Sequence, residues 1–240
     1  PTSRRLASAA NQPMLRVRPE GNELAKRPKS DRCVHCLAHT KALTWDHVFP
    51  EAWYPDATPR HLEKWKVPSC EQCNQEYGEL ENSFLSLVGL CLDPEIDASR
   101  GVVEKALRAA NPSMAKSERD FEARRRKHRS IMSAVKVGRD IPDHATYPGM
   151  GEKWGRSIDE QVAIPVPVDY VTRLAEKFVR GFYYRIGGVL IEPPKQIEPQ
   201  VLSENATAPF RSILDRFGKE YTRPPAFRIR HAEDEAHDAI

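Results

Sequence analysis

Four cysteines stand in two pairs whose spacing is typical of a zinc site. Cys33 and Cys36 form one Cys-x-x-Cys pair, and Cys70 and Cys73 form the other. Each two-residue gap lets a tight turn present both thiolates to one ion at about 2.3 Å, and two such pairs complete a tetrahedral shell. Four thiolates leave no open coordination position, so we expect a structural zinc ion, with catalytic groups in or beside the loop it closes.

Residues suited to phosphodiester chemistry lie inside this loop and just after it. Asp46 and His47 follow a strand-like tripeptide at 43–45, and Asn74 comes directly after the last cysteine of the second pair. Phosphodiester hydrolysis needs an activated water and a cation on the phosphate oxygens. One imidazole and one hard oxygen ligand are therefore a sufficient contribution from the protein.

The segments 46–50 (Asp-His-Val-Phe-Pro) and 70–74 (Cys-x-x-Cys-Asn) resemble the zinc-bound subgroup of the HNH endonuclease family. The resemblance implies a ββα-metal unit, in which one strand ends in the Asp-His pair, a second strand follows, and a helix begins near the asparagine. It also implies that His47 is the general base that deprotonates the attacking water. Asp46 would be a ligand of a catalytic divalent ion, and Asn74 either a second ligand or the group that orients His47.

The last position of the motif departs from the simplest pattern. Eight residues after Asn74 the chain has Asn82 in place of histidine, with Glu79 and Glu81 nearby. A helix from Asn74 would put Glu81 and Asn82 two turns along, on the face that carries Asn74. Asn82 is the first choice and Glu81 the alternative. Without a second histidine the site is richer in oxygen, which favours Mg²⁺ or Mn²⁺ over a catalytic zinc ion.

The remaining chain reads as helices and short strands, so the expected fold class is α+β, an HNH core followed by helices and a small α+β region. Ser117 and Asp120 resemble a capping box, and Asp169 is expected to cap a later helix that ends at the glycine pair 187–188. Periodicity predicts helices at 75–92, 100–110, 117–137, 169–186 and 210–217, and strands at 189–191 and 226–230.

The helix that begins after Ser117 carries the densest positive charge of the chain. We expect one stripe of this helix to pack on the protein, formed by Phe121, Arg125, His128, Met132 and Val135. Such a charge run is usually a solvated helix face, but beside a nuclease motif phosphate binding is favoured. The predicted nucleic-acid contacts are Arg124, Arg125, Arg126, Lys127 and Arg129.

Composition shifts divide the chain into four parts. Residues 1–30 are expected to form a basic, loosely ordered arm, and 31–138 to form the nuclease domain with its zinc site and basic helix. Residues 139–168 are rich in glycine and proline and are expected to be a linker, and 169–240 are expected to form an α+β accessory domain. The first residue is not methionine and the acidic tail stops without a structural signal, which leaves extension at either end open.

Composition also bounds the class of protein. The 240 residues are 40% hydrophobic, enough for one good core or two small ones, and contain no apolar run that approaches the roughly 18 residues of a membrane span. Four of the five cysteines are expected to be metal ligands, and the residues given before them show no signal-peptide pattern, so we expect a reducing, cytoplasmic location. Cys91 lies in an apolar run and is expected to be a buried thiol. A net charge of +3 neither requires nor excludes nucleic acid.

The expected function is metal-dependent cleavage of DNA, with RNA not excluded. Family habit favours a restriction or antiphage-defence nuclease, and control by a homo-oligomer or a regulatory partner protein is expected. The alternative is a zinc-knuckle module that binds nucleic acid without cutting, and a third is a structural domain with His47 as an ordinary core histidine. A pure binding module has no use for Asp46, His47 and Asn74 at these points, so the enzyme is favoured.

Overall fold

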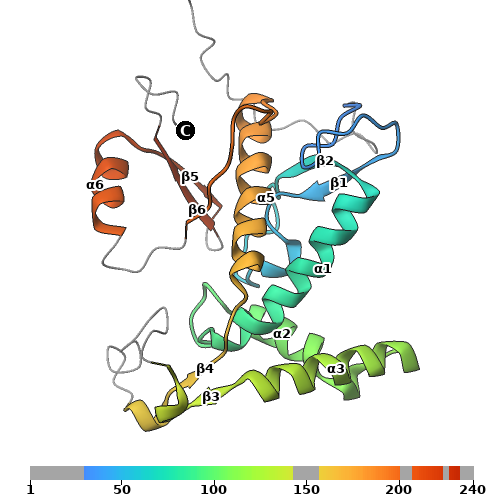
Figure 1. The fold of residues 1–240 in the computed structure, drawn as a ribbon, viewed down its shortest axis with the longest axis vertical. Helices are drawn as coiled ribbons and strands as arrows, with labels where there is room; N and C mark the ends of the chain where they lie inside the picture. The colour runs from blue at the N-terminus through green and yellow to red at the C-terminus, as the bar shows by residue number, and fades with distance from the viewer. Residues whose placement is uncertain (1–29, 143–156, 201–206, 224–226, 233–240) are drawn as a thin grey trace, which may run out of the picture.

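The computed structural model describes residues 30–142, 157–200, 207–223 and 227–232 (Figure 1). The predicted basic arm at 1–30 lies outside this part except for Ser30, as do 143–156 of the predicted linker and the end of the acidic tail. Within the described ranges the fold is mixed α+β, with three two-stranded sheets and five α-helices. None of the helices in these ranges is long and apolar enough to cross a membrane.

A two-stranded antiparallel sheet is followed directly by a helix. Strand β1 (Leu43–His47) pairs antiparallel with β2 (Lys66–Cys70), and Leu43 lies opposite Cys70. Helix α1 (Glu71–Val88) begins at the next residue, because Cys70 leaves the strand and caps the helix through its sulfur. The side chains of Thr44 and Asp46 share one face of β1, since side chains alternate along a strand.

Two further helices extend from α1. Helix α2 (Val102–Ala110) was predicted at 100–110, and it lies so close to α1 that a Cβ added at Gly89 would meet Ala106 at 2.5 Å. Helix α3 (Glu118–Ala134) projects to one side of the molecule (Figure 1). The Ser117 cap is confirmed, because its hydroxyl accepts the Asp120 N–H at 3.2 Å.

The predicted inner stripe of α3 is wrong. Ile131 is the buried residue of this helix, and Arg124 and Lys127 lie on the inner side with it. Met132, which the stripe placed inside, is 60% exposed, and His128 is also exposed. The long aliphatic stems of arginine and lysine cover apolar surface while their charged ends reach polar groups, so periodicity of apolar residues misplaced this face.

The second half of the chain begins with a two-residue pairing of β3 (Lys136–Val137) with β4 (Val162–Ala163). Helix α5 (Val168–Gly187) ends as predicted, with Gly188 in the left-handed conformation at φ 70°. The predicted cap at Asp169 is wrong, since Pro167 precedes the helix and Asp169 lies in its first turn. Pro167 fixes the entry to the helix, and an acidic first turn suits the helix dipole.

The structure also corrects the strand predicted at 189–191, which is irregular backbone with Ile191 buried. Helix α6 (Ala208–Phe217) confirms the helix predicted at 210–217. The strand predicted at 226–230 is β6 (Phe227–His231), and its antiparallel partner β5 (Lys219–Arg223) was not predicted.

One hydrophobic core joins the two halves of the chain. Val48, Phe49 and Trp65 of the hairpin region pack with Phe182 of α5, and the β5–β6 hairpin covers the same cluster. Helix α5 approaches the first half so closely that a Cβ added at Gly181 would lie 2.9 Å from both methyl carbons of Val48. In the described residues, α5 and the β5–β6 hairpin therefore share one hydrophobic core with the β1–β2 hairpin region.

Candidate functional site

The four paired cysteines converge on one point beside the β1–β2 hairpin. Their sulfur atoms all lie within 4.8 Å of one another, and the Sγ atoms of Cys36 and Cys70 are 3.8 Å apart. A tetrahedral ion with bonds of about 2.3 Å to sulfur requires sulfur–sulfur edges of about 3.8 Å. The cluster therefore fits a zinc ion, with Cys33, Cys36, Cys70 and Cys73 as its ligands.

Local backbone structure presents these thiols. The first pair lies on a tight turn, in which Leu37 adopts a φ of 64° and its N–H donates to the carbonyl of Cys33. The second pair lies at the start of α1, where the sulfur of Cys70 accepts the N–H of Cys73 at 3.4 Å. A helix N-terminus favours the negative thiolate, which is the form that binds zinc.

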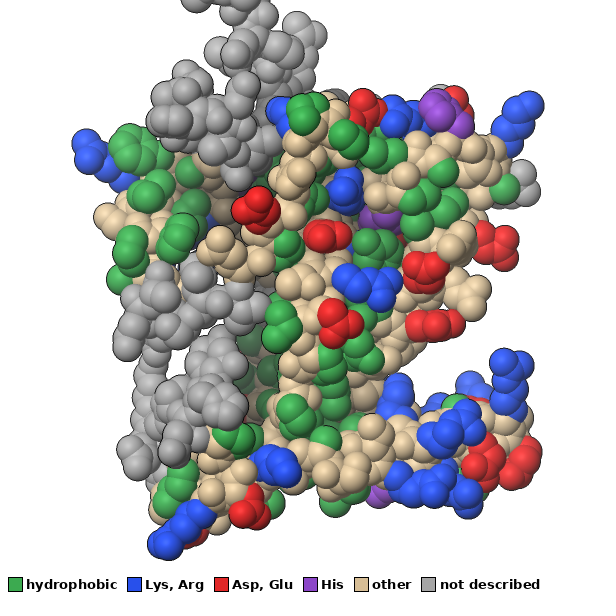
Figure 2. Space-filling view, viewed as in Figure 1, with side chains coloured by type: hydrophobic (Ala, Val, Ile, Leu, Met, Phe, Trp, Pro, Cys, Tyr) green, Lys and Arg blue, Asp and Glu red, His purple; other side chains and the backbone are tan. Residues whose placement is uncertain are grey.

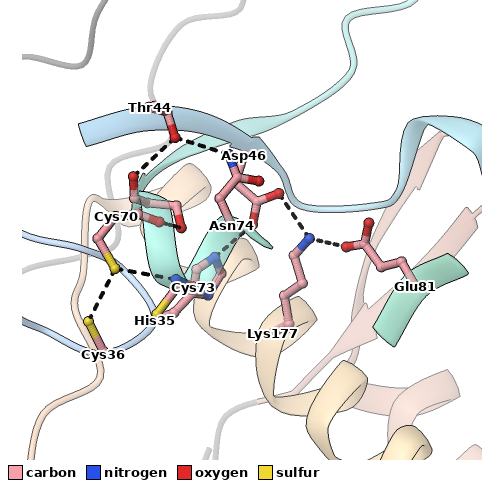
Figure 3. A network of polar contacts seen from close by, with 10 residues as sticks. His35, Cys36, Thr44, Asp46, Cys70, Cys73, Asn74, Glu81 and Lys177 are labelled. Atoms are coloured by element: carbon pink, nitrogen blue, oxygen red, sulfur yellow. Dashed lines mark hydrogen bonds and ion pairs between the residues drawn. The ribbon is translucent and has the colours of Figure 1, made fainter. Parts of the chain in front are cut away.

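Beside the cysteine cluster, a buried network of charged residues surrounds Asp46 (Figure 3). Its Oδ1 accepts a hydrogen bond from Nζ of Lys177 at 3.0 Å, and the same ammonium also pairs with Glu81. The Lys177 side chain is 0% exposed and that of Asp46 is 7% exposed. Burial raises the pKa of Glu81, while the Lys177 ammonium opposes that shift. A buried ammonium is tolerated only when such partners compensate its lost hydration.

His35 connects this network to the zinc loop. Its Nε2 lies 2.9 Å from Oδ2 of Asp46, and its ring packs at 4.7 Å on Tyr77. Burial lowers the pKa of His35, although Asp46 opposes the shift, so the neutral imidazole donates its Nε2 proton to the carboxylate. Burial likewise raises the pKa of Tyr77 to about 12. His35 therefore faces Asp46 and is not a fifth zinc ligand.

Asn74 and Asn82 occupy different environments on α1. The Asn74 amide donates to the hydroxyl of Thr44 at 2.9 Å, which ties the first turn of the helix to the strand face that carries Asp46 (Figure 3). Asn82 is exposed and its amide donates to the carbonyl of Gly78 at 2.9 Å. Of the two residues considered for the last motif position, Glu81 is the one that points into the Asp46 network.

His47 is half-buried at the end of β1, next to its cross-strand partner Lys66. It leaves the strand on the face opposite to Asp46. No hydrogen bond joins its ring to Asp46, Asn74 or Glu81. Burial and, to a smaller extent, the charge of Lys66 lower the pKa of His47. Its imidazole is thus neutral near pH 7 and able to accept a proton.

The residues implied for a catalytic divalent ion do not fit one as they are arranged. Both oxygens of Asp46 already accept hydrogen bonds, one of them from an ammonium, and Glu81 is paired with the same ammonium. Asn74 offers only a neutral amide oxygen. A hard divalent cation needs at least one carboxylate free of a competing positive charge. Lys177 would have to withdraw before Asp46 could bind such an ion.

The predicted phosphate-binding residues of α3 fall into two groups. Arg124 pairs with Asp120 and donates to the carbonyl of Arg108, while Nζ of Lys127 donates to the hydroxyl of Ser86 at 3.0 Å. These two side chains hold the helix in place, and burial lowers the pKa of Lys127. The other three, Arg125, Arg126 and Arg129, are exposed. Figure 2 shows Lys and Arg side chains gathered along the projecting helix.

Sequence reasoning missed Lys177 and the contact between His35 and Asp46. Lys177 lies 131 residues from Asp46, in a helix whose apolar stripe predicted only a packing face. The available signal was a lysine three residues after Leu174 and one residue before Phe178, inside that stripe. Cys91 is a second correction, because it is exposed and not a buried thiol. It follows the end of α1, where the chain turns at the surface.

Comparison with known proteins adds no assignment. No protein-family model matches the chain, and neither a curated protein nor a solved structure gives a significant match. The fold class and the cysteine cluster therefore rest on this chain alone.

Proposed function

We propose that this protein is a zinc-stapled endonuclease of the HNH type that hydrolyses phosphodiester bonds in DNA, with Mg²⁺ or Mn²⁺ as its catalytic ion. The observation that carries the proposal is the hydrogen bond between Asn74 and Thr44. It places the motif asparagine, at the start of α1, against the strand that ends in Asp46 and His47. A zinc ion in the four-cysteine cluster would hold both elements at that point, because Cys70 and Cys73 belong to the strand end and the helix start.

His47 is the residue that we assign to proton transfer. Its half-buried position leaves the ring accessible, and its lowered pKa supplies the neutral form that a general base requires. A divalent ion would supply stabilisation of negative charge on the phosphate oxygens, and Asp46 could hold it only after Lys177 withdraws. A restriction or antiphage-defence role belongs to the same proposal and rests only on the roles that are common in the HNH family.

A second function is favoured by one specific observation. Asp46 is already neutralised by Lys177, which suits a zinc-stapled module that binds nucleic acid through α3 and does not cut it. Such a module needs the cysteine cluster and the exposed arginines, and it leaves Asp46 free for a structural role.

Incubation of the purified chain with supercoiled plasmid, linear duplex, single-stranded DNA and RNA separates the two functions. We expect nicking or linearisation of DNA with Mg²⁺ or Mn²⁺, and none with a chelator that leaves the thiolate-bound zinc in place. Retained binding in a mobility-shift assay without cleavage under any of these conditions would favour the binding module instead.

Neutralising the exposed arginines of α3 tests whether they bind DNA. For Arg125→Gln/Arg126→Gln/Arg129→Gln we expect the slope of log K against log salt to fall by about 0.9 for each phosphate that the variant no longer neutralises. Arg124 and Lys127 are left unchanged because they hold α3 on the protein. The matched control, Arg211→Gln/Arg216→Gln/Lys219→Gln, removes the same charge from exposed positions around α6. Equal slopes for the two variants would show that α3 is a solvated face.

A further inference from the structure

Two carboxylates from different elements share one buried ammonium. Asp46 comes from β1, Glu81 from the second turn after Asn74 on α1, and Lys177 from the middle of α5. Figure 3 shows the Lys177 amine between the two carboxylates. Both carboxylates are within ion-pair range of the amine, and the lysine side chain has no exposed surface. A single positive charge therefore occupies the position between two acidic groups.

The charge balance of this centre is unfavourable for a second cation. With His35 neutral, the two carboxylates of Asp46 and Glu81 and the ammonium of Lys177 sum to one negative charge. Adding a divalent ion would therefore leave a net positive charge in a buried centre. A divalent ion beside the ammonium would meet like charge at short range in a site from which water is largely excluded. Without the ammonium, the two carboxylates would balance one divalent ion.

Packing, and not side-chain freedom, sets the position of Lys177. Its neighbour Phe178 packs against the shared core, with its ring 5.3 Å from that of Phe49. One turn later, Gly181 lets α5 lie directly on Val48. The Lys177 ammonium also lies 5.4 Å from the centre of the Tyr77 ring, which adds a cation–π contact. The helix is therefore held where its lysine must reach Asp46.

We propose that Lys177 is a built-in cation that keeps divalent ions away from Asp46 and Glu81. This inference concerns how metal binding at the Asp46 centre is regulated, and in that sense it rests on the proposed function. Its test, however, needs no nucleic acid. In the wild-type protein the Asp46 centre binds divalent cations weakly. Removing the lysine charge opens a two-carboxylate site for a hard cation such as Mn²⁺.

The test is a titration of the zinc-loaded full chain with Mn²⁺, in which electron paramagnetic resonance measures the free ion. We expect Lys177→Met to bind one Mn²⁺ roughly tenfold or more tightly than wild type, because a unit charge a few ångströms away acts strongly in a buried site. The gain is expected to disappear in Lys177→Met/Asp46→Asn. Lys127→Met is the matched control, since it removes a partly buried amine that faces Ser86, and should bind Mn²⁺ like wild type.

Equal Mn²⁺ affinity in wild type and a folded, zinc-loaded Lys177→Met would overturn the inference. If Lys177→Met does not fold, the Mn²⁺ affinities of Lys177→Gln and of wild type are used to test the inference. The inference is overturned if wild type binds one Mn²⁺ tightly and Asp46→Asn abolishes that binding. If wild type shows no such tight binding, the result supports the inference. Failure of the proposed function looks different, because a protein that never cuts DNA can still gain an Mn²⁺ site when Lys177 is replaced.

Discussion

Replacement of Cys70 with serine is expected to unfold the part of the chain built on the β1–β2 hairpin. A structural zinc site contributes on the order of 10 kcal/mol to folding, which is comparable to the net stability of a typical domain, about 5–15 kcal/mol. Cys70 is also the residue at which β2 ends and α1 begins. Because one core joins both halves, the loss should spread to α5 and should appear as loss of the cooperative thermal transition in circular dichroism.

A second cysteine variant separates the loss of zinc from the loss of the helix cap. Cys36 is exposed and caps no helix, so Cys36→Ser removes only a metal ligand. If zinc carries the stability, both variants should lose zinc by elemental analysis and unfold alike. Cys91→Ser is the control, because Cys91 is exposed and lies outside the cluster. A folded, zinc-free Cys36→Ser protein would refute a structural role for the ion.

The features that sequence predicted well are those that depend on neighbours along the chain. Cysteine spacing predicted the four-cysteine cluster because a two-residue gap is a local geometric constraint. The Ser117 cap and the glycine end of α5 were predicted because they use the side chain or backbone freedom of a single residue. The helix at 210–217 followed from its apolar repeat.

The centre around Asp46 could not be predicted from the sequence, because its members are far apart along the chain. Its partners come from the zinc loop, from α1 and from α5, and Lys177 is 131 residues away along the chain. Periodicity assigned Lys177 to a packing helix, but it carried no information on which residues of other elements its amine would reach. The inner face of α3 failed in a similar way, because Arg124 and Lys127 are held by a carbonyl and a hydroxyl on other elements. Such interactions follow from tertiary packing, not from local propensity.

The buried partners of Asp46 and the position of His47 change the interpretation of the Asp46–His47 pair. The family resemblance implies that Asp46 is a metal ligand, but packing gives its carboxylate a protein cation and a neutral imidazole as partners. His47, one residue later, faces the other side of the strand and keeps an accessible ring. We therefore expect the proposed base and the proposed ligand to respond differently to mutation, because Asp46 makes buried hydrogen bonds to His35 and Lys177 and the His47 ring makes none to this network.

Replacement of His47 with alanine is accordingly expected to lower DNA cleavage by roughly 10² to 10⁴, the usual contribution of a general base. The reason is the loss of the neutral imidazole that would take the proton of the attacking water. The ring makes no hydrogen bond to the Asp46 network, so zinc content, the thermal transition and DNA affinity should stay at wild-type values. Cleavage of plasmid under single-turnover conditions, together with a mobility-shift assay, measures the two effects separately.

The matched control is His61→Ala, which removes another imidazole from the same segment at an exposed position. It should cut like wild type. Near-normal cleavage by a folded His47→Ala protein would contradict the assignment of the base and leave His47 as a packing residue. Comparable losses in His47→Ala and His61→Ala would instead point to a general effect of the segment between β1 and β2. A large loss confined to His47, with unchanged binding, is the result that the proposed mechanism requires.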